Sequence, residues 1–87
     1  MAVFLITYDL IAETVRPNIT GVVHAFRDYM QLSESSYAVS TSLSADAVYA
    51  RFSRVLDSDD TLYVITLSKP ISGQGSDETN KWLAEHL

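Results

Sequence analysis

Cysteine is absent from this sequence of 87 residues. A disulfide framework, a thiolate metal site and a cysteine nucleophile are therefore excluded. The sequence also lacks a long hydrophobic run: the first apolar stretch, 3–9, is far too short to cross a bilayer, and no positively charged segment precedes it. We therefore expect a cytoplasmic protein that has no membrane partner.

Basic residues are scarce, with six Lys and Arg against eleven Asp and Glu, for a net charge of −5. Nucleic-acid-binding proteins usually have the opposite balance, because neutralising phosphates needs clustered Lys and Arg. Composition alone thus argues against a nucleic-acid partner, although a local basic face is still open if two subunits join their arginines. The six cations are Arg16, Arg27, Arg51, Arg54, Lys69 and Lys81.

Chain length limits the protein to one small domain. A chain of this size buries only about 60–65% of its unfolded surface, yet 47% of its residues are hydrophobic. This surplus indicates apolar surface that is buried elsewhere, most simply in a homodimer. Because no repeat, low-complexity tract or long linker divides the chain, we predict a single domain over 1–87.

The N-terminal half predicts a strand, a helix and two further strands. A run rich in β-branched and aromatic residues covers 2–10. Pro17 then supplies helix-start chemistry. From 31 to 41 the pattern has a two-residue period with many serines, which indicates an outer strand or a hairpin, and we favour two strands broken near 34–36. The helical stripe consists of Ile19, Val22, Val23, Phe26 and Met30.

The C-terminal half predicts a helix, a strand and a terminal helix. Ser44 offers an N-cap to the first of these helices. The nearly continuous apolar run 61–67 is typical of a central strand that is covered on both faces. A loop containing Pro70 follows, and Ser76 or Asp77 caps the last helix. That helix carries an apolar patch, which consists of Trp82, Leu83 and Leu87.

This order of elements predicts an α+β fold, the ferredoxin-like βαββαβ sandwich, with core 2–67 and a C-terminal extension over 68–87 that ends in an extra helix. Helices on one face of the sheet would leave its other face bare. A bare apolar face needs a partner to cover it, which again favours a homodimer.

Asp9 is the leading candidate for a functional residue. It closes the apolar run 3–9, where a carboxylate is costly unless it is paired, hydrogen-bonded or bound to a metal. A strand end is a position from which a metal ligand or general base can act. Asp is equally favoured where a strand passes into a loop, so from the residues alone both a metal site and a turn cap stay open.

The other candidates favour structural interpretations. The acidic loop with Asp57, Asp59 and Asp60 lacks the Gly and distal Glu of a calcium loop and is interpreted as a solvated turn, although Asp60 directly precedes a strand. His24 is expected at the edge of the first helical stripe, and His86 suits the end of a helix dipole. The residues 73–75 lack the ending of a phosphate-binding loop, and no G-x-S-x-G elbow occurs. The tyrosines expected in strands, interpreted as core packing rather than base-stacking platforms, are Tyr8, Tyr37 and Tyr63.

Three features in this order resemble the CRISPR-associated protein-two family and related SinR-like proteins. Tyr8-Asp9 matches the Tyr-Asp pair that ends the family's first strand. The segment 31–37 loosely matches its Gln-x-Ser-x-aromatic pattern, and Asp60 precedes the last core strand. The resemblance implies a homodimer in which two strand-end aspartates, here Asp9 and its symmetry mate, bind Mg²⁺ for hydrolysis of a phosphodiester in RNA or DNA.

The sequence also departs from this family. The apolar residues 10–12 follow the Tyr-Asp pair where nuclease-like members have a polar segment, and the chain ends in a helix where the family often adds an exchanged strand. We therefore keep a non-enzymatic alternative, an antitoxin-like or phage-type regulator whose acidic surface binds a protein partner. A dimeric scaffold without any site is the third interpretation.

Overall fold

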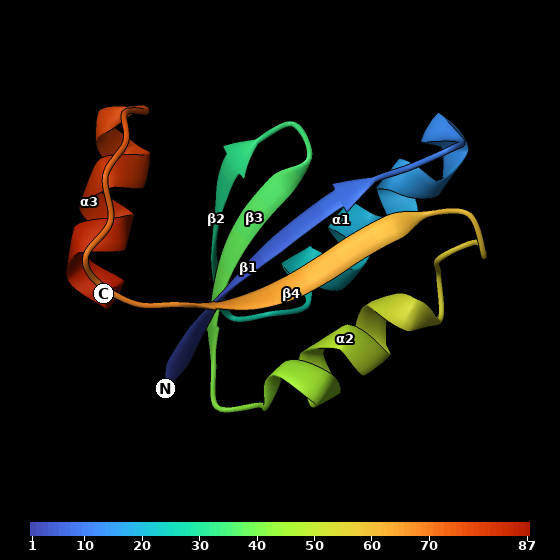
Figure 1. Cartoon of the computed structure of the whole chain (residues 1–87), viewed down its shortest axis with the longest axis horizontal. Coiled ribbons are helices and arrows are strands. Elements are labelled where there is room, and N and C mark those ends of the chain that lie inside the picture. The colour runs from blue at the N-terminus through green and yellow to red at the C-terminus, as the bar shows by residue number, and fades with distance from the viewer.

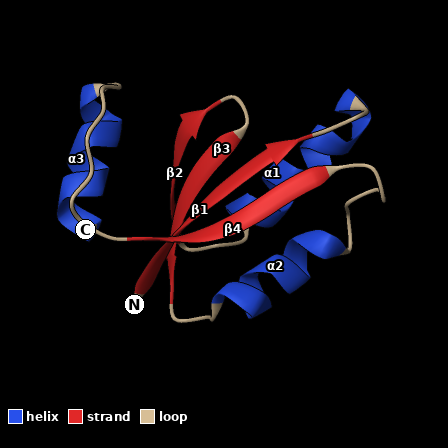
Figure 2. Ribbon diagram, viewed as in Figure 1, coloured by secondary structure: helices blue, strands red, loops and turns tan.

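The computed structural model describes the whole chain, residues 1–87, as an antiparallel four-stranded sheet with three α-helices (Figure 1). The elements are β1 (Ala2–Asp9), the short 3₁₀ helix η1 (Glu13–Val15), α1 (Arg16–His24), β2 (Asp28–Ser33), β3 (Ser36–Thr41), α2 (Ala45–Ser53), β4 (Thr61–Leu67) and α3 (Asp77–His86). The strand order is β2-β3-β1-β4 (Figure 2). The predicted α+β class is confirmed.

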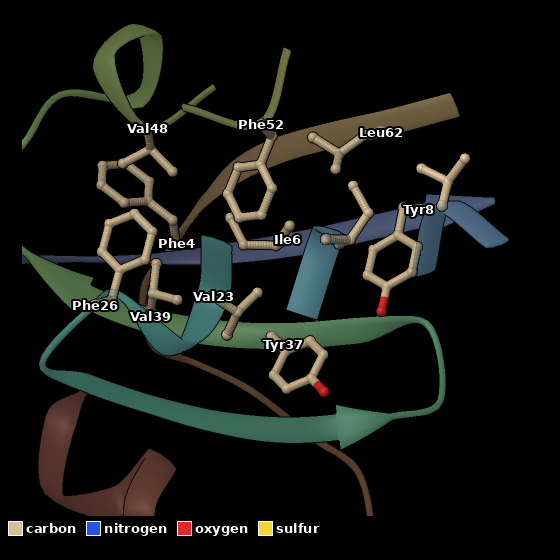
Figure 3. Close-up of a cluster of buried hydrophobic side chains, with 12 residues drawn as sticks. Phe4, Ile6, Tyr8, Val23, Phe26, Tyr37, Val39, Val48, Phe52 and Leu62 are labelled. Carbon is tan, nitrogen blue, oxygen red and sulfur yellow. The ribbon is translucent and has the colours of Figure 1, made fainter. Parts of the chain in front are cut away.

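The main core lies between the sheet and helices α1 and α2 (Figure 3). Residues alternate between the two faces of a strand, and in β1 Phe4, Ile6 and Tyr8 are buried towards these helices. Ile19 and Val23 of α1 and Val48 and Phe52 of α2 are fully buried and complete the cluster. The predicted alternation of β1 therefore sets which side chains enter the core.

The opposite face of the sheet is partly covered by α3. A second cluster joins Val3, Ala38 and Trp82, with Leu83 and Leu87 packed against it. In Figure 1, α3 stands apart from α1 and α2 and lies beside β2. The prediction that this face is bare is wrong where α3 lies, near β2, Val3 and Ala38, because the apolar patch of α3 packs there on the strands of its own chain.

β4 is an edge strand, so its prediction as a central strand covered on both faces is wrong. Leu62 and Val64 point to the main core, but Tyr63 and Ile65 are 64% and 48% exposed. The continuous apolar run therefore reflects one buried face and one apolar surface that is open to solvent.

Helix α1 ends earlier than the stripe predicts. It stops at His24, and Met30 lies in β2. A residue at helical spacing can equally fall on a strand beyond the helix, and periodicity does not distinguish the two. The predicted hairpin is confirmed, because residues 34–35 form the turn that connects β2 to β3.

Both predicted N-caps are confirmed. The hydroxyl of Ser44 accepts a hydrogen bond from the amide of Ala47, and that of Ser76 accepts one from Thr79, each at 3.1 Å. None of the helices combines the length and the apolar character that crossing a membrane requires.

Replacing Phe52 by Ala tests the main core. Because Phe52 is fully buried, Phe52→Ala should lower the free energy of unfolding by about 3–5 kcal/mol, measured by urea denaturation. Tyr49→Ala on the same helix is the control, because Tyr49 is 46% exposed and its loss should cost about 0.5 kcal/mol or less. Equal losses in the two variants would contradict this core.

Candidate functional site

Asp9 lies at the end of β1, paired in register with Thr61 of β4. It shares a face with Leu5 and Thr7, the face opposite α1 and α2, and its side chain is exposed. The expectation that this carboxylate is costly unless partnered is therefore wrong, because a solvated carboxylate pays no burial penalty. No intramolecular hydrogen bond or ion pair engages it.

The loop that follows Asp9 is held by Asp60. The Asp60 carboxylate accepts hydrogen bonds from the amides of Ile11 and Asp57, each at 2.9 Å. The amide of Asp60 also donates to the carbonyl of Asp57 at 3.1 Å. Asp60 thus closes its own turn and ties it to the loop after β1, while the exposed Asp57 and Asp59 fit the predicted solvated turn.

Arg16 anchors the helical segment that follows this loop. Its guanidinium donates to both carboxylate oxygens of Glu13, at 2.7 and 3.2 Å, and to the carbonyl of Glu34 at 2.6 Å. The hydrogen bonds from Arg16 lower the pKa of Glu13. This cation therefore joins η1 and α1 to the β2–β3 turn.

The side chains of Tyr8 and Asp9 lie on opposite faces of the sheet. Tyr8 is buried in the main core, its hydroxyl donates to the carbonyl of Glu34 at 3.3 Å, and burial raises its pKa against the opposing charge of Arg16. Tyr37 is buried as well, so core packing is confirmed for both tyrosines. It is wrong for Tyr63, whose side chain lies exposed on the face that carries Asp9.

A single chain does not assemble a metal site around Asp9. No group of three or more His, Asp or Glu side chains in the chain is placed to hold an ion. Asp9 is therefore not part of a metal site with three or more side-chain ligands from one chain.

The structure reveals a polar cluster that sequence reasoning missed, formed by Asp28, Trp82 and His86. The indole of Trp82 donates to Asp28 at 2.8 Å, and the His86 imidazole contacts the other oxygen of that carboxylate at 2.5 Å. The His86 ring stacks on Trp82 with centroids 3.8 Å apart. The i, i+4 spacing of Trp82 and His86 on one helix was the available signal, but no local pattern pointed to Asp28, which is 54 residues away from Trp82.

The remaining candidate residues, His24 and 73–75, have no contacts that indicate a binding or catalytic role. His24 is exposed rather than partly covered, and its ring stacks on Tyr29 at 5.1 Å. Residues 73–75 belong to an exposed connector between β4 and α3 and build no phosphate-binding loop.

The surface is hollowed at α3 and between α1 and α2. The larger groove, about 740 Å³, lies between α3, the connector and the sheet, and its apolar lining includes Leu5, Leu67, Ile71 and Leu83. The smaller, about 430 Å³, lies between α1 and α2 and contains Arg51 and Arg54. Both of these arginines are exposed and lie on the helical side of the sheet, on the face opposite Asp9.

Comparison with known proteins gives a fold and no activity. The sequence matches no protein-family model and no curated protein. The structure is similar to the crystal structure of a hypothetical protein, TT1823, from Thermus thermophilus, with a TM-score of 0.70 and 16% sequence identity. The match covers 86% of this chain and 92% of that one. At this identity, the likeness shows a shared fold alone.

Asp60→Ala tests the loop anchor. Removing the carboxylate leaves the amides of Ile11 and Asp57 without their acceptor, so the free energy of unfolding should fall by about 1–2 kcal/mol in urea denaturation. Asp59→Ala is the matched control in the same loop and should change it by about 0.5 kcal/mol or less. A neutral Asp60→Ala would show that the loop does not depend on this carboxylate.

Proposed function

We propose that this protein is a ferredoxin-like homodimer related to the CRISPR-associated protein-two family, in which two Asp9 carboxylates bind Mg²⁺ and support hydrolysis of a phosphodiester in RNA or DNA. The βαββαβ order of its first six regular elements supports the ferredoxin-like assignment. The Tyr8-Asp9 pair at the end of the first strand supports the family assignment.

The observation that carries this proposal is that Asp9 borders an exposed apolar patch, formed by Tyr63 and Ile65. Register pairs Thr7 with Tyr63 and Asp9 with Thr61, so Asp9 is one residue pair beyond Tyr63 on the same face. Exposed apolar patches are commonly protein contacts. If a second copy packs on this patch about a two-fold axis, the same patch is buried on both copies. The two Asp9 side chains then approach one another where the axis passes close to the end of β1.

Two Asp9 carboxylates suit Mg²⁺ better than one. This ion keeps several waters and is often held by one or two carboxylates together with phosphate oxygens. When bound, it would orient the phosphate and lower the pKa of a water nucleophile. The part played by the chain is to present Asp9 solvated and unpaired at the end of a strand whose following loop is anchored by Asp60 and Arg16.

A second candidate is the non-enzymatic module that binds a protein partner. It is favoured by the charge distribution: the net charge is −5, and Arg16 is engaged by Glu13. Arg51 and Arg54 lie on the helical side of the sheet. Arg27 directly precedes β2, at the end of the sheet where β1 begins and Asp9 does not lie. No arginine is therefore free beside Asp9 to attract a phosphate. This candidate predicts no divalent-ion binding in calorimetry and no salt-dependent binding of nucleic acid.

Asp9→Asn separates the two candidates. We expect cleavage of RNA or DNA that requires Mg²⁺ or Mn²⁺ in the wild type and disappears in Asp9→Asn, because the amide loses the charge that binds the ion. Asp59→Asn controls for the general loss of one negative charge and should retain cleavage. Equal activity of wild type and Asp9→Asn would reveal a contaminating nuclease, and the metal proposal would then be abandoned.

Tyr63→Asp tests the dimer. A charge placed in the exposed apolar patch should convert a dimer into a monomer at micromolar concentration, measured by light scattering, because burying that charge is costly. Tyr49→Asp is the control, since Tyr49 is an exposed tyrosine of α2 and lies outside the patch. A wild-type protein that is monomeric would remove the basis for a shared site.

A further inference from the structure

Two of the side chains that attach α3 to the sheet contact one carboxylate, that of Asp28. Three side-chain hydrogen bonds connect α3 to the sheet, and all of them end on β2: Thr79 donates to the carbonyl of Gln31, and Trp82 and His86 both contact Asp28. The connector that leads to α3, residues 68–76, is exposed along its whole length. The helix is therefore held by its apolar patch and by this polar cluster, with little help from the chain that precedes it.

The geometry of His86 requires two donated protons. Its Nδ1 lies 2.7 Å from the carbonyl oxygen of Trp82, and its Nε2 lies 2.5 Å from the Asp28 carboxylate. A carbonyl and an ionised carboxylate only accept hydrogen bonds, and a neutral imidazole carries one N–H. Only the imidazolium satisfies both contacts, since either neutral tautomer would place a nitrogen lone pair against an oxygen.

We propose that Asp28, Trp82 and His86 form a proton-dependent latch that holds α3 over the sheet and weakens when His86 loses its proton. In the latched state, α3 covers Val3 and Ala38. Release exposes this part of the sheet and extends the apolar face that is already open at Tyr63 and Ile65. This proposal is independent of the metal chemistry proposed for Asp9.

The charges around His86 support the protonated state. Burial disfavours the imidazolium, but the hydrogen bonds to Asp28 and to the Trp82 carbonyl, with the charges of Asp28 and Glu85, together raise the pKa of His86. The hydrogen bond from His86 is the main cause that lowers the pKa of Asp28, followed by that from Trp82. His86 also lies in the last turn of α3, where a helix dipole favours a cation.

Besides Asp28, Glu85 is the charged side chain that shifts the pKa of His86, and it raises that pKa. On α3 itself, Lys81 faces Glu85 at 3.9 Å. The other strands pack Val3, Ala38 and Leu67 against the helix, none of which titrates. On the same sheet face, Asp9 and Tyr63 are exposed, on the half that α3 leaves uncovered. The pH dependence of the latch is therefore assigned to His86 and Asp28.

The direction of the pH dependence follows from the two shifts. Because the pKa of His86 is raised from 6.5, its contribution is complete below that value and is lost as the pH rises through the raised pKa. Because the pKa of Asp28 is lowered from 3.8, its contribution is present above that value and is lost only as the pH falls through the lowered pKa. The latch is thus closed in mildly acidic solution and weakens towards alkaline pH.

Hydrogen exchange of the α3 amides tests the latch. Between about pH 5.5 and about pH 8.5, the protection of α3, corrected for intrinsic exchange, should fall by no more than about tenfold for each pH unit between the ordinary and the raised pKa of His86, and should then level off. His86→Gln should show low protection that hardly changes with pH. His24→Gln is the matched control, because it removes the other histidine, and should follow the wild type. Protection in β1 and β3 shows that each variant is folded.

A titration of the wild-type histidines completes the test without any substitution. Followed by NMR, His86 should titrate with a pKa above the ordinary histidine value of 6.5. A His86 that titrates at or below its ordinary pKa would overturn the proposal. Protection of α3 that stays constant over the pH range, or a His86→Gln variant that keeps the wild-type pH dependence, would overturn it as well.

Discussion

The fold depends on the burial of β1 from both sides. This strand lies between β3 and β4, and its alternating side chains enter two different clusters. Phe4, Ile6 and Tyr8 pack against the side of α1 and α2, and Val3 packs against Trp82 of α3. One strand therefore positions the main core, the seat of the terminal helix and, at its end, the exposed Asp9.

The uneven cover of the second face explains the character of the surface. α3 lies near β2, at the edge of the sheet farthest from β4, and it reaches β4 only at Leu67. The part of that face formed by Tyr63, Ile65 and the end of β1 therefore stays open. Tyr63, Ile65 and Asp9 are exposed there together. An apolar patch beside an unpaired carboxylate is the arrangement that a symmetric contact would convert into a two-carboxylate site.

The polar side chains of this protein mostly hold loops and helices in place. Asp60 and Arg16 each connect segments that are distant in the sequence, through backbone amides and carbonyls. Asp28 does the same for α3 through two aromatic side chains, one of which can change its charge near neutral pH. The response of the fold to pH near neutrality is thereby placed at α3, whereas the main core contains no buried charged group.

Short-range patterns of residues predicted the elements that depend on local chemistry. The alternation in β1, the caps at Ser44 and Ser76 and the break between β2 and β3 follow from neighbouring residues, and the structure confirms each of them. The Tyr8-Asp9 pair pointed to the end of β1, but the apolar run before Asp9 did not predict that the Asp9 side chain is exposed. Tertiary structure alone decided that β4 lies at the edge, that α3 turns back onto its own sheet and that Asp28 meets His86 across 58 residues. The physical reason is that packing between segments distant in the sequence determines the order of the strands and the position of each helix on the sheet. Short-range periodicity does not show which of these surfaces will pack together.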